Sequence, residues 1–252
     1  MSMPEALAGA VQTPGLWFLA LGAFLAGIVR GFTGFGTAMV YLPAAAQVLS
    51  PFEALTTLLV KDLTGPLIHV PRALKDGHPG DVVRLGFGAL VGLPFGVWVL
   101  SRVPPEVFRW GVSAIALTLL VLLIAGVRYR GRLTRPMIFA TGAIGGFLAG
   151  CVGLPGPPII LLYMASTLPV AVIRANTMLY LILADVLLLA VLWWNGYLVA
   201  TALMLGVLMI VPYTLGNWAG ARLFRPEAEQ LYRWAAYAII AGSALMGLPV
   251  WD

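Results

Sequence analysis

The stretch Gly31-Phe32-Thr33-Gly34-Phe35-Gly36 decides the fold expected for this chain. It interrupts an apolar run from Trp17 to Leu49, whose 33 residues would form a helix of about 50 Å at 1.5 Å per residue. Because a bilayer core is roughly 30 Å thick, the run is too long for one simple span. Each glycine also lowers helix stability by about 1 kcal/mol. The sequence therefore predicts a broken helix, whose pieces Trp17–Arg30 and Thr37–Leu49 are each too short to span comfortably.

A second interruption follows the same plan. The apolar run 136–167 contains Gly153-Leu154-Pro155-Gly156-Pro157-Pro158, and prolines remove amide donors and clash with the preceding helical turn. The tetrapeptide Phe-Leu-Ala-Gly precedes both breaks, at 24–27 and 147–150. Two further pairs recur in the same order, Ser50-Pro51 with Leu168-Pro169 and Phe108-Arg109-Trp110 with Tyr232-Arg233-Trp234. We therefore predict two related membrane repeats, 1–127 and 128–252, each a broken or re-entrant helix pair followed by three transmembrane helices.

The composition places this chain in lipid. Of its 252 residues, 61% are hydrophobic and 10% are charged, and the mean hydropathy is +0.96. These values exclude a soluble enzyme, because too few charges exist to cover a water-facing surface. The net charge of +5 does not indicate nucleic-acid binding, since the basic residues sit in short gaps between apolar runs. The lone Cys151 excludes an intrachain disulfide and a cysteine metal cage, and the Lys- and Arg-free first 15 residues lack the basic start of a signal peptide.

The distribution of basic residues favours one topology. Six ordinary spans are predicted near 54–70, 85–100, 107–127, 170–193, 198–221 and 231–248. If the broken segments also cross the membrane, seven Lys and Arg residues lie on one side and six on the other. If the broken segments are re-entrant hairpins, eleven Lys and Arg residues lie on one side and two on the other. Short loops with Lys and Arg stay in the cytoplasm. The hairpin topology is therefore favoured, with inverted halves, an all-α polytopic fold and both termini in the periplasm.

Broken helices at membrane depth indicate a binding cavity. Unpaired backbone groups cost several kcal/mol in hydrocarbon, so an irregular backbone is tolerated only inside protein or beside a watery cavity. Helix ends near the midplane point amide donors and a partial positive charge into that cavity, which suits an anion. The alternative interpretation is that the glycines only pack helices together.

The two breaks also carry a family resemblance. RGFTGFGTAMVYLP at 30–43 and GCVGLPGPPIILLY at 150–163 resemble the paired glycine-rich motifs of the TauE/SafE sulfite exporter family, and Ile173-Arg174-Ala175-Asn176 resembles its second half. The resemblance covers nearly the whole chain. It implies a multi-pass carrier of the bacterial inner membrane for small anions such as sulfite or organosulfur acids, without a bound cofactor. Many members have a run of glycines where this chain has Pro155-Gly156-Pro157-Pro158.

The candidate site residues lie at or near the breaks. Those predicted to bind substrate are Arg30, Gly34, Phe35, Gly36, Gly156, Pro157, Pro158, Asn176 and Tyr180. The planar fork of Arg30 suits a sulfonate or sulfite, but Arg30 has the alternative role of pairing with Asp185 or Asp62. Asn176 and Tyr180 share a helix face, and they either contact the ligand or join helices by hydrogen bonds.

The other ionisable residues leave two interpretations open. Lys61 and Asp62 are adjacent on a helix, so they point about 100° apart and are each expected to find partners elsewhere. Asp62 and Asp185 are candidate proton carriers, because burial disfavours the charged form of a carboxyl group. The alternative is that both acids only neutralise Arg30 or Lys61.

Several further residues are given structural roles. His69 and His78 are read as interfacial, because a metal site needs more ligands at suitable spacing and none is evident. Tyr41 and Tyr163 each follow a break and are predicted to gate it. The Trp193–Tyr197 cluster is read as an aromatic belt, and Arg128–Arg132 as an anchor to anionic lipid.

Three classes of function are compared. The leading one is a secondary carrier that moves a small anion by alternating access. A passive anion channel is the alternative, since the same helix ends can form a pore. An intramembrane enzyme is disfavoured, because no nucleophile with a base and no phosphate-binding loop is visible. Proton coupling and a homodimer stay open, and the expected partners are the small anion and membrane lipid.

Overall fold

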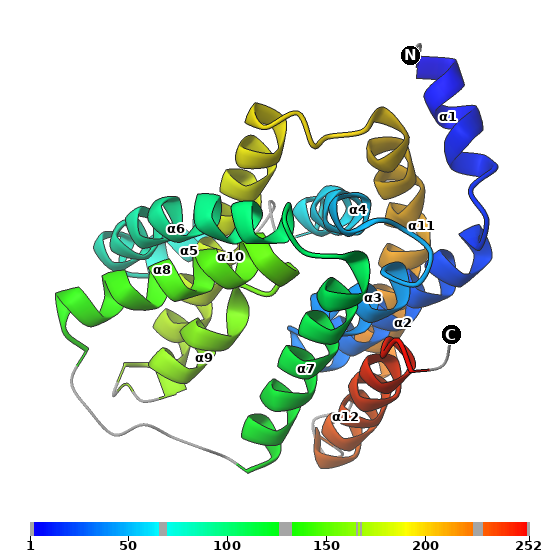
Figure 1. The fold of residues 1–252 in the computed structure, drawn as a ribbon. Helices are drawn as coiled ribbons and strands as arrows, with labels where there is room; N and C mark the ends of the chain where they lie inside the picture. Colours follow the sequence, from blue (N-terminus) through cyan, green and yellow to red (C-terminus); the bar gives the residue numbers. More distant parts are fainter. Residues whose placement is uncertain are drawn as a thin grey trace. The chain divides into compact units, whose positions relative to one another are not determined.

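The computed structural model describes residues 3–65, 70–125, 133–164, 166, 168–223 and 229–250 (Figure 1). Within these ranges all regular structure is helical. The helices are α1 (Met3–Val11), α2 (Leu16–Thr33), α3 (Thr37–Ala45), α4 (Pro51–Leu63), α5 (Val70–Asp76), α6 (Pro79–Leu100), α7 (Pro105–Ile124), α8 (Arg135–Val152), α9 (Gly156–Met164), α10 (Val170–Trp194), α11 (Ala200–Leu223) and α12 (Glu229–Met246). The predicted all-α class is confirmed.

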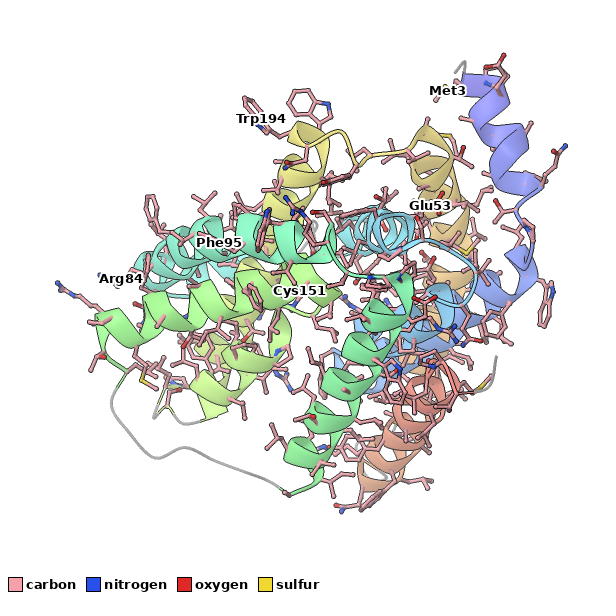
Figure 2. The ribbon with its side chains drawn as sticks, viewed as in Figure 1. Met3, Glu53, Arg84, Phe95, Cys151 and Trp194 are labelled. Carbon is pink, nitrogen blue, oxygen red and sulfur yellow. The ribbon has the colours of Figure 1, made fainter. Side chains whose placement is uncertain are left out.

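The described helices have the dimensions and the surface of membrane spans. Six of them, α2, α6, α7, α8, α10 and α11, are long and apolar enough to cross a bilayer. On α6 the side chains of Phe87, Val91, Phe95 and Trp98 are all more than half exposed, and their spacing places them on one face of the helix. Figure 2 labels Phe95 on this helix. An exposed apolar stripe of this kind fits lipid rather than water, so the chain is a multi-pass membrane protein.

The extents of two segments differ from the sequence expectation. The span predicted at 54–70 overlaps α4, whose 13 residues fall short of the about 20 that a bilayer core requires. Conversely, α2 continues through Gly31 and Phe32 to Thr33 and reaches 18 residues, so the piece before the break is long enough to span. Gly31 lies within the helix, and glycine suits this position because α11 approaches closely: an added Cβ would lie 2.6 Å from the backbone nitrogen of Ala221.

The structure confirms a helix break at the first predicted place. Gly34 ends α2 in the left-handed conformation, with φ of 78°, and its N–H donates to the carbonyl of Arg30 at 2.7 Å. Gly36, with φ of 90°, immediately precedes α3 as its N-cap. Between them, the Phe35 N–H donates to the Thr33 hydroxyl at 3.3 Å. Left-handed backbone costs a residue with a Cβ roughly 1–2 kcal/mol, which explains why glycine occupies both positions.

A break at the second predicted place is confirmed too, but its geometry differs from the rigid turn that we expected at Gly156-Pro157-Pro158. Gly153 ends α8 with φ of 69°, and its N–H donates to Ala149 at 3.0 Å. Gly156, Pro157 and Pro158 instead form the first turn of α9. Prolines fit there because their fixed φ is helical and the first turn needs no amide donors.

The chain divides into two compact units. The first contains residues 1–64, 104–121 and 197–252, and the second contains 65–103 and 122–196. Each unit therefore combines segments from both predicted sequence halves. Within the first, α2 packs on α11; within the second, α8 packs on α6 (Figure 1). The broken helix of each half thus lies beside a long helix of the other half.

The two repeated tetrapeptides make the same contact in their own units. A Cβ added at Gly27 would meet the carbonyl oxygen of Tyr213 and lie 2.8 Å from the backbone nitrogen of Asn217, four residues on. A Cβ added at Gly150 would lie 2.6 Å from the carbonyl oxygen of Leu93 and 2.7 Å from the nitrogen of Val97, again four residues on. Both positions are buried points of close helix approach. The inverted relation of the halves stays a prediction.

Candidate functional site

A cluster of charged side chains lies inside the first unit, beside the first break. Arg30 comes from the last turn of α2, and Lys61 and Asp62 come from the last turn of α4. The start of α4 is fixed by a capping box, in which the Glu53 carboxylate accepts the Ser50 N–H at 3.0 Å and the Ser50 hydroxyl at 2.7 Å. Such a cap satisfies the free amides of a first turn, so the helix that positions Lys61 and Asp62 has a defined beginning.

Lys61 is fully buried and held on several sides. Its ammonium nitrogen lies 4.5 Å from the centroid of the Tyr41 ring and 4.6 Å from that of Tyr213. It also donates to Asp62 Oδ1 at 2.8 Å. The expectation that these adjacent residues do not face each other was wrong, because the flexible four-carbon stem of lysine carries the ammonium group around the helix to its neighbour. Buried charge is tolerated where it is paired in this way.

Arg30 lies at the partly exposed edge of this cluster. Its Nη1 donates to the Thr37 hydroxyl at 3.2 Å and lies 4.0 Å from Asp62 Oδ2, which is beyond hydrogen-bond distance. The side chain keeps 23% of its surface exposed. Since Thr37 is the first residue of α3, the guanidinium lies at the amino end of that helix. The sequence left open that Arg30 pairs with Asp62. The structure shows this ion pair as a 4.0 Å contact without a hydrogen bond.

The two breaks are not chemically equivalent. The first four amides of a helix have no partner within it. At α3 these belong to Gly36, Thr37, Ala38 and Met39, all of which have an N–H. At α9 they belong to Pro155, Gly156, Pro157 and Pro158, and proline has no N–H. We expected amide donors at both helix ends, but the amino end of α9 offers a single one, from Gly156.

The predicted residues of the first break differ in exposure. Gly34 is exposed, while Phe35 and Gly36 are partly exposed. No described atom lies within 4 Å of a Cβ added at Gly34, whereas one at Gly36 would lie 3.1 Å from Val29 Cγ1. The backbone at Gly34 is therefore open to approach.

The polar residues predicted in the second unit are engaged with protein. The fully buried side chain of Asn176 accepts the His78 N–H at 2.7 Å and donates to the Tyr163 hydroxyl at 3.0 Å. The Tyr180 hydroxyl donates to the Gly142 carbonyl at 3.3 Å. These contacts join α10 to α9, to α8 and to the residue before α6, as the structural interpretation of Asn176 and Tyr180 expects. Whether either residue also meets a ligand stays a prediction.

The remaining candidates belong to the second unit. Asp185 lies on α10 and is partly buried. Gly156 and Pro158 on α9 are also partly buried, and Pro157 between them is buried. Trp193 and Trp194 are 69% and 84% exposed, and Figure 2 shows Trp194 projecting from the end of α10, as an aromatic belt residue does. Among the described residues, no three His, Cys, Asp or Glu side chains gather as metal ligands. His69 and the predicted lipid anchor Arg128–Arg132 lie outside the described residues.

Two residues of the charged cluster were missed by the sequence analysis. Thr37 accepts the Arg30 guanidinium from seven residues away, across the break, where helical spacing no longer predicts neighbours. Tyr213 supplies a ring to Lys61 from α11, and no local pattern links positions so far apart in the chain. A tyrosine within an apolar run was the only available signal.

The apolar exterior, the two interrupted helices and the internal charged cluster together define a polytopic membrane transport protein. The sequence model described as Sulfite exporter TauE/SafE matches residues 19–246, so the chain belongs to the TauE/SafE sulfite exporter family. This family consists of membrane transporters and not of enzymes. The resemblance of the two glycine-rich motifs is thereby confirmed.

A curated relative gives a consistent result. A protein of Cupriavidus necator named "Probable sulfite/organosulfonate exporter TauE" is 23% identical over 225 residues, which cover 83% of this chain and 84% of the relative. No solved structure matches the chain.

Proposed function

We propose that this protein is a secondary carrier of the bacterial inner membrane that exports small organosulfur anions, sulfite or sulfonates, by alternating access. The observation that carries this proposal is the position of Arg30. Its guanidinium bonds to the first residue of α3, and the amides of Gly36, Thr37, Ala38 and Met39 at this end have no partner within the helix. A cation and a helix amino end thereby lie side by side.

The chemistry of this place suits a sulfonate or sulfite group. Such a group presents three oxygens with delocalised negative charge, and arginine binds planar pairs of oxygens through two parallel N–H bonds. Helix amides satisfy the third oxygen. The exposed backbone at Gly34 gives the anion room to reach these donors. Lys61 does not take part directly, because it is enclosed by Tyr41, Tyr213 and Asp62.

The kind of binding site favours a carrier over a channel. Conduction through a channel requires weak binding at several successive positions, whereas a strong local site of arginine and amides retains its ligand until the protein rearranges. The names of the family and of the relative support export. Proton coupling through Asp62 or Asp185 and periplasmic termini belong to the same proposal, on the sequence arguments given above.

Anion binding by Arg30 is the point to test first. The purified protein in detergent is titrated with sulfite, methanesulfonate, sulfate and acetate, and the thermal shift is followed. Arg30→Gln should weaken the binding of sulfite and methanesulfonate by about 10- to 150-fold, since a hydrogen bond to a charged group contributes about 1.5–3 kcal/mol. Arg72→Gln is the matched control, because Arg72 is 88% exposed and pairs with Asp76 at the surface at 3.4 Å.

Transport is then measured in proteoliposomes. Wild-type protein should show saturable uptake and counterflow of labelled sulfite or methanesulfonate, which a passive channel does not show. Unchanged anion binding and transport in Arg30→Gln would reduce Arg30 to an ion-pair partner of Asp62. Flux that does not saturate, with no counterflow, would replace the carrier by a channel.

A further inference from the structure

The three charged side chains of the cluster, Arg30, Asp62 and Lys61, form a row in which one pair is in close contact and the other is wider. Asp62 lies in the middle, and its two carboxylate oxygens face different cations. Oδ1 accepts the Lys61 ammonium at 2.8 Å, while Oδ2 lies 4.0 Å from Arg30 Nη1. The Asp62–Lys61 pair is thus a hydrogen-bonded ion pair, and the Asp62–Arg30 pair is an electrostatic contact without a hydrogen bond.

The Arg30 end of the row is the end that a ligand can reach. Lys61 has no exposed surface, whereas Arg30 keeps 23% of its side chain exposed and Asp62 keeps 13%. An anion that binds Arg30 therefore does not need to separate Asp62 from Lys61. The carboxylate keeps its own cation when the ligand arrives, so loading the site leaves no unpaired acid behind.

An alternating-access carrier that performs net export must also return without its substrate. During that return the binding site passes through a closed state, in which a charge without a counter-ion is costly. We propose that Asp62 is the counter-ion that replaces the substrate anion at Arg30 in the empty carrier, and so permits the unloaded carrier to return. This inference rests on the proposed function. It adds that the Asp62 carboxylate makes net transport possible, whereas a carrier without it is largely limited to exchange.

The charges of the three side chains give the expected effect of removing this carboxylate. With Asp62 ionised, Arg30, Lys61 and Asp62 sum to +1 when the site is empty and to zero with a monoanion bound. In Asp62→Asn the same sums are +2 and +1. The loaded variant therefore has the charge of the empty wild-type carrier, which is able to reorient, while the empty variant has one further positive charge.

The return of the empty variant is therefore slowed selectively. A charge inside the membrane costs at least about 2.5 kcal/mol, which corresponds to about a 70-fold slower step at 1.36 kcal/mol per tenfold. Net efflux requires the empty return and should fall by about that factor. Exchange cycles only through loaded states and should stay within about threefold of wild type.

The experiment compares both modes in the same proteoliposomes. Labelled methanesulfonate, a monoanion, is the main probe, and labelled sulfite is the second. Net efflux is measured into buffer without substrate, and exchange into buffer with unlabelled substrate, with the potential clamped at zero by potassium and valinomycin. Asp62→Glu, which keeps the carboxylate, should retain net efflux. Asp76→Asn removes a surface carboxylate paired with Arg72 and should leave both modes unchanged.

The binding affinity separates this role from a merely structural one. Methanesulfonate binding to Asp62→Asn, measured by thermal shift, should be unchanged or tighter, because the competing carboxylate is gone. Weaker binding, or a loss of efflux and exchange in equal proportion, would overturn the proposal. A wild-type protein that exchanges but shows no net efflux would overturn it without any variant. Absence of flux in both modes for both probes would instead refute the proposed function itself.

Discussion

Replacing Gly150 by alanine tests how closely α8 and α6 approach each other. The added Cβ would lie 2.6 Å from the carbonyl oxygen of Leu93, whereas a comfortable carbon–oxygen contact is about 3.3 Å. The two helices must therefore separate by about 0.7 Å. Forcing an extra carbon into a packed contact costs about 1–3 kcal/mol. Alanine also favours the helix over glycine by about 1 kcal/mol, so the net destabilisation of Gly150→Ala is about 0–2 kcal/mol.

Gly242→Ala provides the matched control for the helix-propensity contribution. Gly242 lies within α12, and no described atom is within 4 Å of its added Cβ. This variant should be stabilised by about 1 kcal/mol. The difference between the two variants isolates the packing cost of about 1–3 kcal/mol, which amounts to about 2–12 °C in melting temperature for a chain of this length.

Gly27→Ala is the third member of the series. Its Cβ would meet the backbone of Tyr213 and Asn217 in the same pattern as that of Gly150 meets Leu93 and Val97, with a closer approach to the carbonyl oxygen, so Gly27→Ala should lose at least as much stability as Gly150→Ala. The assay is thermal unfolding in detergent, followed by intrinsic tryptophan fluorescence. If Gly150→Ala and Gly27→Ala melt as high as Gly242→Ala, then the close approach of these helices, and with it the described packing of both broken helices, is wrong.

Two further predictions concern the breaks and the orientation. Gly156→Leu should fold, because Gly156 has an ordinary helical backbone and its nearest neighbours would lie 3.8 and 3.9 Å from an added Cβ. It should lose transport, because the bulk of leucine blocks the approach of the ligand. Gly36→Leu should lose transport for the same reason and also lower stability by roughly 1–2 kcal/mol, since φ is 90° there. Retained transport by folded Gly156→Leu would place the second break away from the ligand path. A periplasm-dependent phosphatase fused after Asp252 should be active, and activity only of a cytoplasmic reporter would reverse the predicted topology.

The positions of the breaks could be predicted from the sequence because they depend on local chemistry. Clustered glycines and prolines act on their own backbone, so Gly34, Gly36 and Gly153 interrupt their helices whatever lies nearby. The extents of the helices depend on packing as well. Gly31 looked like part of the break, yet it lies within α2, where α11 approaches it closely, and that approach is not visible in the sequence of the segment itself.

The charged cluster shows the same limit. Arg30, Lys61 and Asp62 stood out because charges inside apolar segments are rare, and the structure brings all three together. Their pairing was not predictable from helical angles, because the reach of a lysine side chain exceeds the separation that those angles impose. Tyr213 joins the cluster only through tertiary packing. The amide asymmetry of the two breaks, by contrast, was already encoded by Pro155, Pro157 and Pro158.

The exchange of helices between the two sequence halves bears on the origin of such a chain. The broken helix α2 of the first half packs on α11 of the second, and α8 of the second packs on α6 of the first. If one ancestral gene was duplicated, its product contained both an interrupted helix and a long partner helix, and the packing seen here joins each interrupted helix to the partner helix of the other copy. The same packing in that ancestor would have required two identical chains, each covering the interrupted helix of the other.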